Sequence, residues 1–394
     1  MRHIREDARP LRARVEERSL PMKSFRRIAA LTVSTFMASS TAVAGSDDVP
    51  VKDVLKVVTT FSDYASITQE IGGEKVTVEH LSYGDQDPHF VPPKPSLALK
   101  LKDADLFVTT GLDLEMWATT LLDKARNKKI MDGAVGYVTV YTGIELLQKP
   151  TTALSRTEGD IHIYGNPHIQ TSPLNWKTIS ENILIGLKKV DPENAAYYEE
   201  RQKAFADKVD RAMFGDDLVD LLGGQTLTQL LQGGTLFDFL EREFEGEVLV
   251  NRLGGWLEEA LPFRGKKVIA YHKNWAYFVR DFGLEVIDYI EPKPGIPPSA
   301  RHVKEVVEKI KAQGIELMLV ATYFEKNSPR MIEQRTGIKA VFLPISVGGV
   351  PEASDNFELV DYWIAHIKEG FGMEPAEKGR HRYRHRTGQG TSKE

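Results

Sequence analysis

The chain has 394 residues, with 51 Lys+Arg against 56 Asp+Glu, 41% hydrophobic residues and no cysteine. This length is enough for two or three domains with cores of their own, and the composition is that of a soluble globular chain. The lack of cysteine excludes a disulfide scaffold, a thiolate metal site, a thiol nucleophile and a lipid-modified N-terminal cysteine. A formal charge of −5 gives no support for a nucleic-acid-binding surface.

Residues 1–44 are predicted to be a signal peptide preceded by a non-native extension. A basic start at Met22 leads into the apolar run Ile28–Ala44, which ends in the small-x-small pattern of a signal peptidase site. The run contains too many Ser and Thr residues for a membrane span. We therefore expect a mature chain that is exported to the periplasm and is not lipid-anchored. Without residues 1–44 the balance is 42 Lys+Arg against 52 Asp+Glu, a charge of −10.

Residues 50–173 carry alternating strand and helix patterns and are predicted to form an N-terminal α/β lobe. The expected strands are Lys56–Phe61, Lys75–Leu81, Leu106–Thr110 and Tyr137–Tyr141. The expected helices between them are Asp63–Ile71, Ser96–Lys102 and Leu114–Ala125. Strands that alternate with helices in this way predict βαβ units and a parallel sheet.

Residues 263–372 repeat the pattern and are predicted to form a C-terminal α/β lobe. The expected strands are Lys267–Tyr271, Glu285–Ile290, Glu316–Ala321 and Ala340–Pro344. The expected helices are Trp275–Phe282, Ala300–Gln313, Ser328–Thr336 and Phe357–Lys368. The predicted fold class is therefore α/β, with two doubly wound parallel-sheet lobes.

Three further segments complete the predicted organisation. Residues 174–213 predict a long linking helix, with a break at Asp191-Pro192 where proline can occupy a first helical turn. Residues 214–262 contain short amphipathic stretches between glycine pairs and are predicted to be an insertion, either packed on a lobe or offering a partner surface. Residues 373–394 are predicted to be a disordered basic tail, whose histidines are weak candidates for metal capture.

Three histidines lie where α/β lobes carry their ligands. His89 follows the second strand in a proline-rich loop, His168 directly precedes the linking helix, and His272 ends the first strand of the second lobe. Neutral imidazole is a common ligand of zinc and other late first-row metals. Because these side chains come from both lobes, they predict a metal site between the lobes.

In these motifs the sequence resembles the metal-specific cluster of periplasmic zinc/manganese solute-binding proteins of ABC transporters. The matching stretches, within a likeness over about residues 54–370, are Asp87-Pro88-His89, Asn166-Pro167-His168, Tyr271-His272 and Ile290-Glu291-Pro292. The resemblance implies two lobes joined by a rigid helix, with a metal site in the interlobe cleft and delivery of the ion to a cognate membrane permease. Carried over residue by residue, it implies that His89, His168 and His272 are the metal ligands.

The fourth ligand position departs from the family's pattern. Many members carry an Asp in the stretch that is Leu343–Gly349 here, which contains no carboxylate. The metal would then have three histidines and a water, or a carboxylate elsewhere, with Asp85, Asp87 and Glu291 as candidates. The long His/Asp-rich loop of many zinc-specific members is also missing from the sequence. The short segment in its place holds only His162, which is either an auxiliary ligand or a loop residue.

Zinc is the predicted cargo, because manganese sites favour carboxylate oxygens whereas three imidazoles favour zinc; Mn²⁺ or another divalent metal remains an alternative. We expect a monomeric carrier without catalytic residues, whose binding weakens as the pH falls through the imidazole range. One alternative is a zinc-dependent hydrolase with a three-His site, although the sequence lacks H-E-x-x-H, G-x-S-x-G and P-loop motifs. Another is a manganese- or other metal-binding adhesin-like protein.

Overall fold

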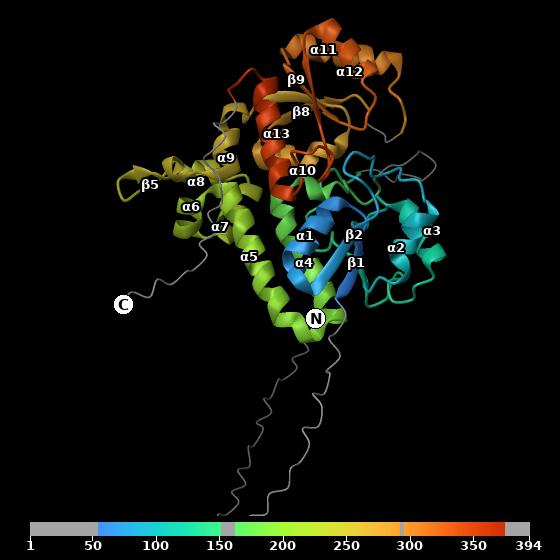
Figure 1. Ribbon diagram of the computed structural model, residues 1–394. Helices are drawn as coiled ribbons and strands as arrows, with labels where there is room; N and C mark the ends of the chain where they lie inside the picture. The colour runs from blue at the N-terminus through green and yellow to red at the C-terminus, as the bar shows by residue number, and fades with distance from the viewer. Residues whose placement is uncertain (1–53, 151–161, 292–294, 375–394) are drawn as a thin grey trace, which may run out of the picture. The chain divides into compact units, whose positions relative to one another are not determined.

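The computed structural model describes residues 54–150, 162–291 and 295–374 (Figure 1). The predicted signal at 1–44 and residues 375–394 of the predicted tail lie outside this part of the chain, so both stay predictions. Within it, two four-stranded sheets and one two-stranded sheet form. No helix of the described residues is both long enough and apolar enough to cross a membrane.

The N-terminal lobe is built on a parallel sheet with the strand order β2-β1-β3-β4. Its strands are β1 (Leu55–Thr59), β2 (Val76–His80), β3 (Leu106–Thr109) and β4 (Tyr137–Thr139). Its helices are α1 (Ser62–Gly72), α2 (Pro95–Lys102) and α3 (Met116–Ala125). Strand β3 is buried along its whole length, as expected for a central strand of a parallel sheet.

The C-terminal lobe has a parallel sheet with the order β10-β9-β7-β8. Its strands are β7 (Lys267–Ala270), β8 (Glu285–Tyr289), β9 (Leu317–Ala321) and β10 (Lys339–Leu343). Its helices are α10 (Ala276–Phe282), α11 (Ala300–Gln313), α12 (Asn327–Thr336) and α13 (Asn356–Gly370). Counted within each lobe, both sheets run second, first, third, fourth strand, so the lobes share one topology, and the α/β prediction is confirmed.

Side chains on the two faces of the C-terminal sheet belong to different apolar clusters. Ile269, Met318 and Val320 pack with residues of α11 and α12. Their sequence neighbours, such as Val268 and Leu319, belong to a larger cluster that also contains the core of the N-terminal lobe. This division follows from the alternation of side chains along a strand. The two lobes are therefore joined by packed apolar side chains of this larger cluster, in addition to the covalent chain.

The connecting region consists of two helices, α4 (Pro173–Val190) and α5 (Ala195–Phe214), which pack against each other as a hairpin. The predicted linking helix over 174–213, with its break at Asp191-Pro192, corresponds to these two helices, and the chain reverses direction at the break. Between them lies a 3-10 turn at Pro192–Asn194. Because proline has no N–H and its ring clashes with the preceding turn, the chain cannot continue α4 through Pro192. Asp191 fixes the bend, since its Oδ2 accepts hydrogen bonds from Asn194 Nδ2 (2.7 Å) and the Tyr198 hydroxyl (2.7 Å).

Aromatic side chains attach this hairpin to the C-terminal lobe. The ring of Trp176 in α4 lies 6.1 Å from that of Trp256 in α9 (Gly255–Ala260) and 5.8 Å from that of Phe357 in α13. The Trp256 indole also donates a hydrogen bond to Asp361 Oδ1 (2.6 Å). Apolar ring contacts therefore hold the hairpin, and the hydrogen bond fixes the partner rings of α9 and α13 relative to each other.

The region predicted as an insertion begins with short helices, as its glycine pairs suggest. They are α6 (Asp216–Leu222), α7 (Gly224–Gln232) and α8 (Leu236–Leu240), followed by a small hairpin of β5 (Glu243–Phe244) and β6 (Glu247–Val248). Helices α6 and α7 pack on α5. Gly223, between these two helices, has a φ of 78°, a backbone conformation that glycine adopts without strain.

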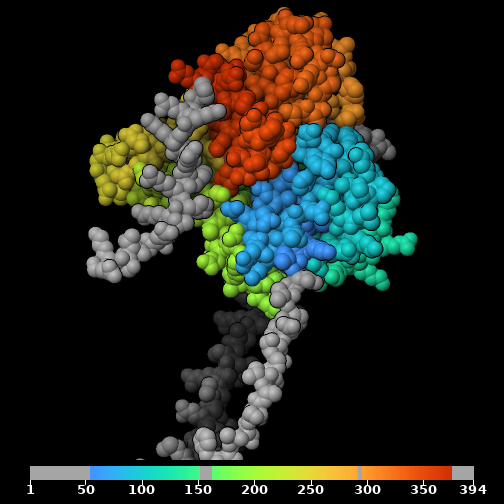
Figure 2. Space-filling view, viewed as in Figure 1, coloured from blue at the N-terminus to red at the C-terminus, as the bar shows by residue number. Residues whose placement is uncertain are grey.

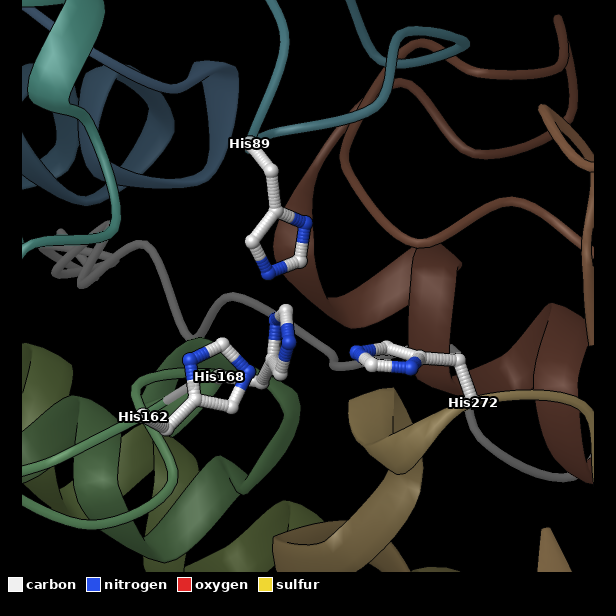
Figure 3. A group of neighbouring side chains, drawn as sticks. All are labelled: His89, His162, His168 and His272. Atoms are coloured by element: carbon white, nitrogen blue, oxygen red, sulfur yellow. The ribbon is translucent and has the colours of Figure 1, made fainter. Parts of the chain in front are cut away.

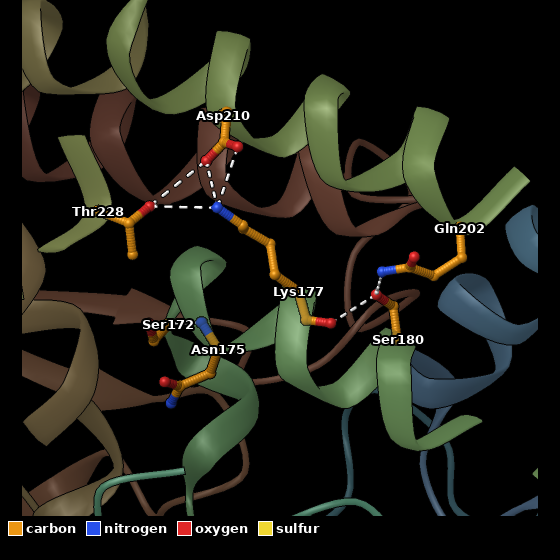
Figure 4. Close-up of polar contacts among 7 residues, drawn as sticks. All are labelled: Ser172, Asn175, Lys177, Ser180, Gln202, Asp210 and Thr228. Carbon is orange, nitrogen blue, oxygen red and sulfur yellow. Dashed lines mark hydrogen bonds and ion pairs between the residues drawn. The ribbon is translucent and has the colours of Figure 1, made fainter. Parts of the chain in front are cut away.

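A buried ion pair connects α4, α5 and α7 (Figure 4). Lys177 Nζ donates to both carboxylate oxygens of Asp210 (2.7 and 3.0 Å) and to Thr228 Oγ1 (3.3 Å). The side chains of Lys177 and Asp210 are only 13% and 10% exposed. Burial raises the pKa of Asp210, and the hydrogen bond and charge of Lys177 oppose that rise.

Replacing Lys177 by methionine should therefore destabilise the fold. The variant leaves the Asp210 carboxylate buried without its cation, and we expect a loss of about 3 kcal/mol in the free energy of urea unfolding. The double variant Lys177→Met/Asp210→Leu should recover part of that loss. Lys304→Met, at an exposed pair with Glu308, is the control and should change stability by less than about 0.5 kcal/mol. Equal effects at Lys177 and Lys304 would contradict this role of the ion pair.

Candidate metal centre

His89 lies in the loop between β2 and α2 and is held by its own neighbours. Its ring Nδ1 is 2.8 Å from Asp87 Oδ1, and its backbone N–H donates to the same oxygen (2.9 Å). The Trp117 indole donates to the carbonyl of Pro88 (2.9 Å), which fixes the loop on α3. With Nδ1 donating to Asp87, the lone pair of the ring is on Nε2. The side chain is only 3% exposed.

His168 lies in a segment that is tied to the C-terminal lobe through Asn166. The Asn166 side chain accepts from the backbone N–H of His168 (2.9 Å) and donates to the carbonyl of Lys273 (2.8 Å). The Tyr277 hydroxyl donates to the carbonyl of Asn166 (2.6 Å). His168 is fully buried, and neither of its ring nitrogens has a hydrogen-bond partner among the described residues.

His272 follows β7, where its ring is oriented by the end of the neighbouring strand. Its Nδ1 is 2.7 Å from the carbonyl oxygen of Glu291, whose own N–H donates to the carbonyl of Tyr271 (2.7 Å). Donation by Nδ1 again leaves the lone pair on Nε2. The residue is 1% exposed.

His162 lies beside these three residues, although the sequence left its role open. Its carbonyl accepts from the N–H of Gly165 (3.1 Å) in a turn that precedes His168. Its ring stacks on that of His89, with centroids 5.3 Å apart and an interplanar angle of 22°. The only signal in the sequence was its position six residues before His168. It is half-buried, whereas the other three are buried.

The four rings converge from three parts of the chain, His162 and His168 sharing one segment (Figure 3). One ring nitrogen of each lies within 4.8 Å of those of the others, and this set contains no carboxylate of the described residues. The Nε2 atoms of His89, His162, His168 and His272 are buried without a partner among the described residues. Burying such atoms unpaired costs free energy, so the arrangement suits a cation that accepts their lone pairs.

Burial favours the neutral form of His162, His168 and His272. Burial, together with the neighbouring His89, lowers the pKa of His162 to about 2 and that of His272 to about 4. Burial is also the main cause that holds the pKa of His168 well below its usual range. A neutral imidazole retains the lone pair that a metal ligand needs.

The carboxylates considered as fourth ligands lie outside the group of nitrogens. Asp85 is exposed, and Asp87 accepts from the ring of His89. The Glu291 carboxylate accepts from the N–H of Gly295 (2.9 Å), while its carbonyl accepts from His272. Burial raises the pKa of Glu291. Asp87 and Glu291 therefore orient histidine rings, a role that carboxylates and carbonyls commonly have around metal sites.

The loop that carries His89 touches the loop after β10 directly, and Figure 2 shows the blue N-terminal residues against the orange C-terminal ones. A Cβ atom on Gly84 would lie 2.2 Å from the carbonyl oxygen of Val347 and 2.3 Å from the nitrogen of Gly349. The Ser62 hydroxyl at the start of α1 donates to the same carbonyl of Val347 (2.7 Å). Only glycine permits this approach of two backbones.

Comparisons with known proteins identify relatives along most of the chain. It is 24% identical over 359 residues to the iron-binding protein YfeA of Yersinia pestis, covering 89% of this chain and 97% of that protein. It is 22% identical over 357 residues to the manganese ABC transporter substrate-binding lipoprotein PsaA of Streptococcus pneumoniae, covering 89% and 99%. It is 24% identical over 304 residues to the zinc-binding lipoprotein AdcA of the same species, covering 76% of this chain but only 51% of AdcA.

A solved structure supports the same fold. The crystal structure of ZnuA superposes with a TM-score of 0.58 at 23% sequence identity, covering 81% of this chain and 99% of that one.

The family model for the zinc-uptake complex component A, periplasmic, matches residues 57–213 and 250–370. The unmatched stretch, 214–249, falls within the predicted insertion. This match covers well over half of the chain. The chain therefore belongs to the zinc-uptake component A family, whose members are metal-binding solute-binding proteins of ABC transporters and not enzymes.

Proposed function

We propose that this chain is an extracytoplasmic carrier of Zn²⁺, which it binds through His89, His168 and His272 and passes to its ABC transporter permease. The observation that carries the proposal is the set of buried imidazole nitrogens that point together without hydrogen-bond partners among the described residues. A divalent cation that accepts these lone pairs removes the cost of burying them.

The choice of zinc rests on ligand chemistry. Relatives are named for iron, manganese and zinc, so membership of the family does not determine the metal. Imidazole nitrogen suits Zn²⁺, whereas Mn²⁺ prefers carboxylate and carbonyl oxygens. The nitrogen group contains no carboxylate from the described residues, which supports zinc over manganese.

We also propose that the carrier acts as a monomer in the periplasm without a lipid anchor. AdcA and PsaA are named as lipoproteins, whereas the sequence here contains no cysteine to carry a lipid.

The purified chain should bind one zinc ion far more tightly than manganese, as measured by competition titration with a metal indicator. His272→Ala should weaken zinc binding by at least about a hundredfold, because it removes a ligand outright rather than a group that orients one. His366→Ala is the matched control, since His366 stacks on Tyr362 in α13, outside the group of four, and its variant should bind zinc normally. Tighter binding of manganese than of zinc would disprove the assignment.

Zinc affinity should depend on pH less than that of an exposed histidine site. A lowered pKa means that the neutral form of His162, His168 and His272 persists to lower pH. Three ordinary histidines with a pKa of about 6.5 would lose about a thousandfold in apparent affinity by pH 5.5. We expect a loss of no more than about tenfold between pH 7.5 and 5.5, measured with a pH-insensitive competitor. Zinc should therefore be lost at a lower pH than the imidazole range expected from the sequence. A thousandfold drop in affinity between pH 7.5 and 5.5 would contradict this.

The contact between Gly84 and Gly349 should matter for affinity although neither residue can bind the metal. A Cβ on Gly84 would push the His89 loop away from the other lobe, because backbone atoms lie 2.2–2.3 Å from its position. Gly84→Ala should therefore weaken zinc binding by about tenfold or more through misplacement of His89. Tyr83→Ala, at the adjacent exposed residue, serves as the control. Equal affinities for both variants would show that the loop tolerates displacement.

A further inference from the structure

We propose that His162 is the fourth ligand, so that the bound ion is held by four imidazoles with no coordination position left for water. This inference rests on the proposed function, since it concerns the same metal ion. A four-histidine site behaves differently from a three-histidine site. A zinc ion with three protein ligands keeps one coordination position open to water, whereas an ion with four protein ligands has none.

The positions of the four nitrogens agree with a tetrahedral site. With zinc–nitrogen bonds of about 2.0–2.1 Å, the nitrogens of an ideal tetrahedron lie about 3.3 Å apart. The nitrogens here lie within 4.8 Å of one another. Even at that upper limit, each would need to move by less than about 1 Å toward the centre, which ring rotation and small loop shifts can supply.

The chain around His162 places its ring beside the other three, with centroids 5.3 Å from His89, 5.4 Å from His168 and 6.1 Å from His272. The N–H of Gly165 donates to the His162 carbonyl, and the N–H of Asn166 donates to the carbonyl of Leu147 (2.8 Å). Gly165 has a φ of 121°, and a Cβ there would lie 2.9 Å from Cβ of Leu146. This turn therefore fits closely against residues 146–147. The five residues between the two histidines let the ring of His162 return to the side of His168.

A loop residue without a role would not be expected to occupy this position. The Nε2 of His162 is buried with no partner among the described residues, although the residue as a whole is only half-buried. An imidazole on a loop can recover water at that nitrogen by a change of rotamer, so its burial next to three other free nitrogens favours a common ligand.

Four neutral imidazoles do not neutralise the positive charge of the ion, so groups around them must do so. The Asp87 carboxylate lies 2.8 Å from the ring of His89, and the Glu291 backbone carbonyl lies 2.7 Å from that of His272. These acceptors increase the basicity of the rings they contact. The carboxylates of Asp87 and Glu291, which are not ligands, balance the positive charge of the bound ion from a distance. Nitrogen-only, tetrahedral coordination favours zinc and disfavours manganese, which prefers six oxygen ligands.

The test compares the unmodified protein with His162→Ala, His162→Asp and the control His366→Ala, using Zn²⁺, Mn²⁺ and Co²⁺ alone as probes. Cobalt reports coordination through its visible absorption, which is intense in four-coordinate sites and weak in six-coordinate ones. The unmodified protein should give an intense spectrum that azide does not alter. His162→Ala should still bind one ion, about 10- to 100-fold more weakly, and azide should change its spectrum by entering the opened position.

His162→Asp should shift the ratio of zinc to manganese affinity toward manganese, because it replaces a nitrogen ligand by oxygen. The inference is overturned if His162→Ala keeps the zinc affinity and the cobalt spectrum of the unmodified protein, or if azide alters the unmodified protein equally. The proposed function fails separately, if the unmodified protein binds no zinc or if His272→Ala leaves zinc affinity unchanged.

Discussion

Four buried imidazole nitrogens without hydrogen-bond partners in the described residues are the constraint around which this structure is arranged. Each such atom costs roughly 1–3 kcal/mol relative to a paired one, so the metal-free group is a source of instability that the rest of the fold has to offset. A cation that accepts all the lone pairs removes this cost upon binding. Affinity and stability are therefore linked, since the ion stabilises the folded state to which it binds.

The nitrogens stay close only because elements distant in sequence are held against one another. Asn166 hydrogen-bonds to Lys273 and Tyr277 of the C-terminal lobe, which fixes the segment that carries His168. Ser62 and Gly84 contact the loop after β10, which fixes the loop that carries His89. The aromatic contacts of Trp176 hold the helical hairpin on the same lobe. These contacts determine the distances between the four histidine rings more narrowly than the sheets could alone.

Most elements of both lobes could be predicted within one or two residues, because strand and helix periodicities are strong where both faces of a sheet are covered. The helical hairpin of α4 and α5 was harder to predict from the sequence. The Asp191-Pro192 break was recognised, but the direction of the chain after it depends on contacts of α5 with α1, α7 and α9 that no local pattern records. His89 and His272 lie together because the loops that follow strands have defined places in an α/β lobe, and His168 joins them at the start of the connecting helix α4. His162 lies on neither kind of element, and its position depends on the turn to Gly165, whose geometry the sequence does not specify.

The carboxylates show why the metal preference of such a protein depends on a few side chains and not on its fold. Relatives named for iron, manganese and zinc share most of the chain's length, yet the stretch Leu343–Gly349 contains no acidic residue here. Asp87 lies two residues before His89, and this spacing lets its carboxylate turn back onto the ring of His89 instead of facing the other nitrogens. An acidic group in that place strengthens a nitrogen ligand without becoming an oxygen ligand. A carboxylate a few ångströms away, beside the four nitrogens instead of behind the ring of His89, would change the donor set from nitrogen alone to mixed nitrogen and oxygen. The preferred metal would change with it.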